Sequence, residues 1–314
     1  MTMRTRVAWA GAAVTLSIGG LAACSSSQDV SVSAATGAGG PSAIQRASVK
    51  TVDVGSAKFS LTVSASGVPG TNGTASVNAD GAIDNANQRA QITVDLSKAA
   101  DGLPGVGGAA IGALGDNGQV QIVTDGPDAY LKLGSLASIL GATSGQSWVK
   151  VSDKNHSGVS TGVSVASGSE ILKLLGETGN VTTVGAEQVR GVQTTHYRGT
   201  LDVAAAIGQL PADEQKQVSD RLSQLGIDPK SISFPVEVWV GEDDLVRRVQ
   251  LGFDGSQIPG GETAGVKATV TLEFYDFGAP VDITVPSPDQ VFNFDPSMLK
   301  GLPGLSGLPG LGGS

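Results

Sequence analysis

Cysteine, aromatic residues and charge are all scarce in this sequence. Its 314 residues include one cysteine, three tryptophans, three tyrosines and seven phenylalanines. Charged residues make up 16%, against about 25% in an average soluble domain. A single cysteine excludes an intramolecular disulfide and any metal site that needs several thiolates. The formal net charge of −9 makes nucleic acid and anionic lipid surfaces poor partners.

Catalytic and metal-binding patterns are missing as well. The chain has two histidines, His156 in a polar stretch and His196 in an alternating one. Neither is accompanied by the G-x-S-x-G turn of a serine hydrolase. The acidic run Glu242-Asp243-Asp244 lacks the alternate ligand positions of a calcium loop, so it is expected to be a solvated turn. We therefore expect no enzymatic activity, no catalytic residues, no cofactor and no metal.

The one cysteine ends an apolar segment near the N-terminus. Met1–Arg6 contains two arginines and no acid, Val7–Ala23 is apolar, and small residues precede Cys24. This pattern is typical of a lipoprotein signal, so we expect export, cleavage before Cys24 and acylation of its sulfur. An ordinary cleaved signal with a cysteine near the cut is the alternative. Acylation would leave no free thiol and would anchor the protein on the extracytoplasmic face of the cell membrane.

Composition divides the rest of the chain. Residues 24–40 are rich in serine, alanine and glycine and are expected to form a flexible tether. Residues 41–297 form the expected domain, interrupted by a nearly uncharged Gly/Ala-rich insertion at 99–118. A loop of that length is typically either functional or disordered. Residues 298–314 repeat glycine at every third position but are too few for a triple helix, so a low-complexity, disordered tail is expected.

Alternation of apolar and polar residues dominates the domain. Phe59, Leu61 and Val63, for example, alternate with serine and threonine, which indicates a strand with one apolar and one polar face. Short turns rich in glycine, asparagine and aspartate separate such stretches, so about ten strands in a mainly antiparallel sheet are expected. The expected strands cover residues 58–65, 74–83, 89–96, 119–124, 128–133, 148–151, 181–189, 191–202, 234–241, 245–254 and 267–277.

Helical spacing is confined to a few short stretches. Asp202 is the expected N-cap of a helix over 203–210, and Pro211 opens the most regular helix, which runs to Gly226. Residues 286–298 are expected to be a loose wrap without regular structure. The other expected helices lie within 41–54, 136–140 and 169–176.

The fold class expected is therefore α+β, mainly antiparallel β, with one apolar sheet face. Such a sheet has more apolar surface than a few short helices can cover. Either the sheet curls until its own side chains meet in a closed core, or an apolar cavity remains that a hydrophobic ligand fills. The candidates for lining such a cavity are Val63, Ile83, Ile92, Val94, Val236, Val238, Leu272 and Phe274.

Several stretches of the domain also form a wider pattern. They are Gly185-Ala186-Glu187, Val189, Gly191-Val192, Thr194-Thr195-His196-Tyr197, Gly199, Leu201-Asp202, Pro235-Val236-Glu237-Val238-Trp239-Val240 and Leu245-Val246-Arg247-Arg248. Together they resemble the exported lipoproteins of high-GC Gram-positive bacteria, specifically the LppX/LprG-type group of the LolA-like class. The resemblance spans residues 41–296 and consists of strand and turn residues. The insertion at 99–118 and the tail depart from the family pattern.

The resemblance implies a curved half-barrel sheet with a few helices over its concave face. It also implies a cavity that holds the acyl chains of a lipid or lipoglycan, and a carrier or chaperone role with a membrane transporter as a further partner. Apart from the resemblance, Arg247 and Arg248 are candidates to pair with a lipid phosphate or sugar acid. The alternative is that one arginine lies on the polar face and the other bonds a nearby acid. The alternative function is a structural or regulatory lipoprotein with a closed core that binds a membrane protein.

Overall fold

The computed structural model describes residues 39–68, 73–97, 118–139, 141–152, 172–176, 180–210, 212–224, 226–258 and 264–292. The expected signal segment, Cys24, the 298–314 tail, and nearly all of the tether and of the 99–118 insertion lie outside these residues. The expectations for those segments therefore stay predictions. Within the described part of the chain, no helix is both long enough and apolar enough to cross a membrane.

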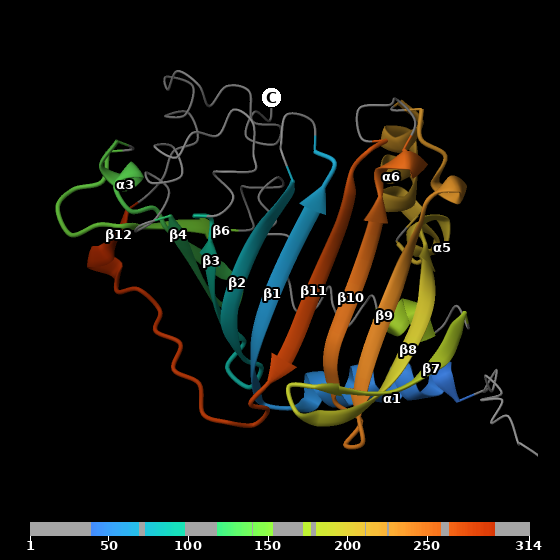
Figure 1. The fold of residues 1–314 in the computed structure, drawn as a ribbon. Helices are drawn as coiled ribbons and strands as arrows, with labels where there is room; N and C mark the ends of the chain where they lie inside the picture. The colour runs from blue at the N-terminus through green and yellow to red at the C-terminus, as the bar shows by residue number, and fades with distance from the viewer. Residues whose placement is uncertain are drawn as a thin grey trace, which may run out of the picture. The chain divides into compact units, whose positions relative to one another are not determined.

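The described strands form a single sheet (Figure 1). They are β1 (Ser56–Ser66), β2 (Thr74–Asp84), β3 (Arg89–Asp95), β4 (Gln119–Asp125), β5 (Asp128–Lys132), β6 (Trp148–Ser152), β7 (Val181–Val189), β8 (Val192–Asp202), β9 (Ser233–Gly241), β10 (Val246–Asp254), β11 (Lys267–Tyr275) and β12 (Val291–Phe292).

The sheet is open and almost wholly antiparallel. Its order is β12-β6-β5-β4-β3-β2-β1-β11-β10-β9-β8-β7, so β12 and β7 are the two edges. Only the pairing of β12 with β6 is parallel. The structure therefore confirms the expected α+β, mainly antiparallel fold class. The expectation for residues 286–298 was wrong at one point, because Val291 and Phe292 pair with Trp148 and Val149 instead of wrapping loosely.

The helices are few and short, as expected. They are α1 (Gly40–Asp53), α3 (Leu136–Ile139), α5 (Val203–Gly208), α6 (Ala212–Gln224), a helical turn at 172–176, and the 3-10 turns η1 (Pro229–Ser231), η2 (Gly255–Gln257) and η3 (Pro288–Gln290).

Helix α1 and the turn at 172–176 cover part of the sheet. Ile44 and Ala47 of α1 are fully buried, and they share one apolar core with Leu172 and Leu175 and with side chains from β1, β2, β9, β10 and β11. In Figure 1, α1 runs across the ends of β9 and β10. Helix α6 contributes less to the cover than its apolar spacing predicted. It has no fully buried residue and packs on α5, which in turn contacts β8.

The polar side of the sheet is not exposed to solvent along its whole width. At the β2–β6 end, Val123 and Trp148 point away from the main core, yet both are buried under Ile283 and the chain around it. The alternation of residues in β4 gave no sign of this second apolar cluster. A segment far along the chain, 281–291, supplies its cover.

The N-cap predicted at Asp202 is present. Its carboxylate accepts hydrogen bonds from the backbone N–H of Ala204 at 2.8 Å and of Ala205 at 3.2 Å. We expect Asp202→Ala to lower the free energy of unfolding by about 1 kcal/mol, because two N–H groups lose their acceptor. Asp202→Asn keeps an acceptor and should cost less. Denaturant unfolding of the three proteins tests this, and equal stability of the alanine variant and the native protein would contradict it.

Candidate functional site

The apolar face is the surface of the sheet on which cross-strand pairing aligns aliphatic and aromatic side chains. Residues paired across neighbouring strands lie on the same face of a sheet. Three rows of paired residues cross the apolar face. They are Phe274–Phe59–Gly81–Ile92–Ile122–Leu131–Val149–Phe292, then Tyr197–Val238–Val249–Leu272–Leu61–Ala79–Val94–Val120, then Gly199–Val236–Leu251–Val270–Val63–Val77.

All eight side chains predicted from the sequence as cavity candidates lie on this face. Seven stand in the three rows, and Ile83 lies on the same side of β2, opposite Ala57 and Ala90. The face also includes residues that were not singled out, such as Leu61, Val77 and Val270. The same alternation could have revealed them, since each lies an even number of positions from a chosen residue.

Burial divides the eight candidates into two groups. Ile83, Ile92, Val236, Val238 and Phe274 are buried and belong to the core under α1 and the turn at 172–176. The remaining three, Val63, Val94 and Leu272, are only half-buried. The buried members are therefore part of the core, whereas the half-buried members keep part of their surface exposed.

The partly exposed apolar surface increases along the strands, away from α1. In β1, Phe59 is 1% exposed, whereas Leu61 and Val63 are half-buried. Val63 lies between Val77 of β2 and Val270 of β11, which are half-buried too. Among the described residues, the apolar face is thus closed at the α1 end and less covered at the end marked by Val63.

Arginines 247 and 248 are both paired with acids of the protein itself. Arg248 donates to Glu273 at 2.7 Å, and Arg247 bonds Asp243 in the β9–β10 turn. Burial tends to raise the pKa of Glu273, but hydrogen bonds from Arg248 and Arg190 outweigh it and hold that pKa below its usual value. Of the two interpretations offered by the sequence, the pairing with nearby acids is the one the structure contains.

A second cluster on the polar face centres on His196, which is 3% exposed. Its ring stacks on Trp239, with centroids 4.2 Å apart and planes 11° from parallel. Its Nδ1 lies 3.1 Å from Glu187 Oε1, and its Nε2 lies 3.1 Å from Glu237 Oε2. The sequence showed His196 only as one residue of an alternating strand. The cluster depends on the register of β7, β8 and β9, which local patterns do not reveal.

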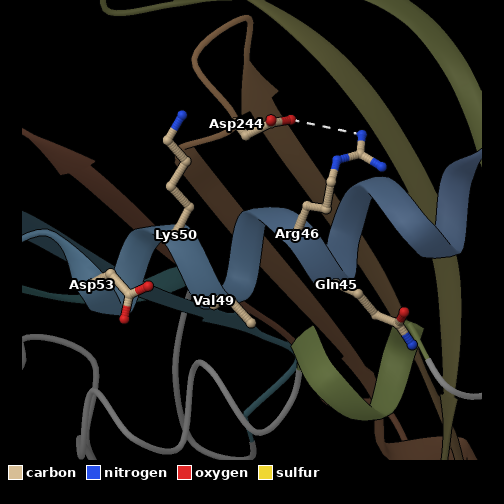
Figure 2. Close-up of a pocket in the computed structure, with 6 residues that line it drawn as sticks. All are labelled: Gln45, Arg46, Val49, Lys50, Asp53 and Asp244. Atoms are coloured by element: carbon tan, nitrogen blue, oxygen red, sulfur yellow. Dashed lines mark ion pairs between the residues drawn. The ribbon is translucent and has the colours of Figure 1, made fainter.

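A shallow depression of about 440 Å³ lies on the outer side of α1 (Figure 2). Arg46 and Lys50 point toward the β9–β10 turn, where Asp244 lies 3.8 Å from the Arg46 guanidinium. Val49 and Asp53 point to the other side of the helix. Two cations and two carboxylates balance here, and the exposed ion pair contributes little to stability. The depression is separate from the apolar face, because α1 turns Ile44 and Ala47 toward the sheet.

Groups of acids and histidines suited to a metal are absent from the part of the chain that the structure describes. Glu242, Asp243 and Asp244 form the expected turn between β9 and β10. Two of these acids form ion pairs with arginines, Asp243 with Arg247 and Asp244 with Arg46.

No family model matches the chain. One curated relative, described as an uncharacterized 31.2 kDa protein in the rplA-rplJ intergenic region of Streptomyces griseus, is 26% identical over 209 residues. The match covers 63% of this chain, and the chain spans 64% of the length of that relative.

The solved structures that the chain matches include the following three. LprF from Mycobacterium bovis has a TM-score of 0.42 at 17% identity and covers 79% of this chain and 96% of its own. The lipoprotein LppX from Mycobacterium tuberculosis has a TM-score of 0.43 at 14% identity, covering 78% and 97%. A LolA superfamily protein from Nitrosomonas europaea has a TM-score of 0.26 at 9% identity, covering 78% and 96%. All three matches, to LprF, LppX and a LolA superfamily protein, extend over most of this chain.

Proposed function

We propose that this protein is a membrane-anchored lipoprotein of the cell envelope that binds the acyl chains of a lipid or lipoglycan against its apolar face. It would act as a carrier or chaperone, exchanging its cargo with a membrane transporter. The single observation that supports this best is the apolar face itself. Its rows extend across the sheet from β8 to β12, and none of their side chains is charged.

The energetics favour an acyl chain as the ligand. Each methylene moved from water onto an apolar surface contributes about 0.8 kcal/mol, so a chain needs apolar contact along its length and few polar contacts. The half-buried side chains of Val63, Val94 and Leu272 offer such contact. The carboxylates near this sheet are turned to its polar side, where arginines pair with Glu237 and Glu273.

One observation favours a second function. Five of the eight candidate residues are buried by the protein's own side chains, as expected for a core that needs no ligand. A structural or regulatory lipoprotein with a closed core, which binds a membrane protein through its exposed loops, would have the same five residues buried. The two functions differ in whether the half-buried residues contact a lipid. A measurement of lipid binding therefore distinguishes them.

Native mass spectrometry of protein made without the signal segment and Cys24 tests the proposal. We expect co-purified acyl lipid, or uptake of a fluorescent fatty acid by the delipidated protein. Protein that is empty on purification and takes up no fatty acid would contradict lipid binding. Recovery of one stoichiometric membrane protein without any lipid would support the second function.

A pair of substitutions in β1 tests which face binds. Val63→Asp places a charge on the apolar face between Val77 and Val270. Burying a carboxylate without a partner is costly, so we expect fatty-acid affinity to fall at least about tenfold. Ser64→Asp, one residue along on the polar face between Ser76 and Thr269, is the control and should bind as the native protein does. Equal affinity of both variants would exclude this part of the face as the binding site.

A further inference from the structure

We propose that His196 is a proton-controlled latch that holds the edge strand β7 against the sheet in its charged form and loosens it in its neutral form. The latch joins β7, β8 and β9 through Glu187, His196 and Glu237. That loosening of β7 also releases a bound lipid rests on the proposed function, whereas the latch itself does not.

The hydrogen bonds available around His196 favour the charged form of its ring. Both ring nitrogens of His196 lie 3.1 Å from carboxylate oxygens, one of Glu187 and one of Glu237. A neutral imidazole has one N–H and so can donate to only one of these acceptors, which leaves two lone pairs facing each other at the second. The imidazolium donates to both. Histidine is the side chain that changes between these two forms near neutral pH.

The charged groups around His196 come from five strands, β7 to β11. Glu237 of β9 has a second cationic partner, because Arg198 of β8 donates to it at 2.8 Å. Arg248 of β10 lies over the Trp239 ring at 5.1 Å and pairs with Glu273 of β11. Loss of the His196 proton therefore leaves Glu237 paired.

Glu187 depends on His196 more than Glu237 does. Among the described residues, its side chain bonds only His196 and the Trp239 indole, which donates at 2.7 Å. The indole hydrogen bond, helped by the charge of His196, holds the pKa of Glu187 below its usual value, so Glu187 remains a carboxylate. Deprotonation of His196 thus removes the cation that is hydrogen-bonded to Glu187 of β7.

β7 is the strand that we expect to loosen when His196 loses its proton. Among the described strands it is an edge of the sheet, where it pairs only with β8, and seven of its nine residues are exposed. Its first residue, Val181, belongs to the apolar core together with Leu172 and Leu175, which lie just before it in the chain. Leu175 also occupies the space beside Gly199 in the third row of the apolar face. A looser β7 would therefore loosen part of the cover of that face.

Hydrogen exchange of the protein without its lipid anchor tests the latch. Amides of β7 are compared at about pH 5.5 and about pH 8.5 after correction for intrinsic rates, with β2 and β3 as the internal reference. We expect relative exchange in β7 to rise about tenfold at the higher pH, the effect of losing one charge-assisted hydrogen bond. His196→Gln should remove the pH dependence, and His156→Gln, at the chain's only other histidine, should retain it.

Tryptophan fluorescence gives an independent readout. The sequence has three tryptophans, and one of them, Trp9, lies in the expected signal segment. In protein made without that segment, Trp148→Phe therefore leaves Trp239 as the single tryptophan. Because an imidazolium quenches a stacked indole, we expect emission to rise as His196 loses its proton, and this rise should vanish in His196→Gln.

Two results would overturn the latch. One is equal corrected exchange in β7 of the native protein at both pH values. The other is a pH-dependent fluorescence change that persists in His196→Gln. If His196→Gln does not fold, Glu187→Gln replaces it and should abolish the pH dependence of β7 exchange. If β7 responds to pH but no fatty acid binds, the latch stands and the proposed lipid-binding function fails.

Discussion

Replacing Cys24 by serine is expected to move the protein almost completely from the membrane fraction to the soluble fraction. Each acyl methylene buried in the bilayer contributes about 0.8 kcal/mol, and two or more chains anchor a protein stably. Without the thiol no acyl group can be attached. Among the residues that the structure describes, no helix is long and apolar enough to cross a membrane.

Fractionation of a lipidating bacterial host, with labelled palmitate in the medium, measures both effects. The native protein should be labelled and sediment with membranes, and Cys24→Ser should do neither. Ser25→Ala keeps the thiol and is the matched control. A Cys24→Ser protein that still sediments with membranes would show that something other than acylation holds it there.

Replacing Gly81 by alanine is expected to destabilise the fold by about 2 kcal/mol, within the range for overpacking a core. Gly81 lies opposite Phe59 in the first row of the apolar face. A Cβ there would overlap the Phe59 ring and the backbone oxygen of Gln91. Phe59 is 1% exposed and sits in the centre of the core, so the ring has little room to move.

The matched control for this change is Gly55→Ala. Gly55 does not have a positive φ, and a Cβ there would meet nothing within 4 Å. We expect its free energy of unfolding to stay within about 0.5 kcal/mol of the native value. Denaturant unfolding of both variants gives the difference. If Gly81→Ala and Gly55→Ala lower the free energy of unfolding equally, the packing of the Phe59 ring does not require a glycine at position 81.

Much of the fold follows from short-range patterns. The alternation at Phe59, Leu61 and Val63 predicted a strand with one apolar face, and the register of β1 with β2 and β11 confirms it. The strands predicted at 181–189 and 191–202 meet at Arg190 and Gly191, which form the turn between β7 and β8. Both have positive φ, 49° and 79°, as a tight two-residue hairpin requires. Such signals are readable because each depends on neighbouring residues alone.

The long-range arrangement was not readable in the same way. β1 lies in the middle of the sheet between β2 and β11, although about 200 residues separate β1 from β11. The burial of Trp148 under the distant segment around Ile283 had no local sign either. The same holds for His196, whose partners Glu187 and Glu237 become neighbours only when three strands align.

By itself, the sequence determined the candidate anchor at Cys24, the positions of nearly all strands, and which side of each strand is apolar. These depend on residue type and on a period of two, which hold wherever the strand is placed. Only the tertiary structure decided which strands are neighbours, and hence which apolar side chains are buried under α1 and which stay half-buried. That choice reflects packing between segments far apart in the chain, where many pairings satisfy the same alternation and only one buries the core of Ile44, Phe59 and Val238 together.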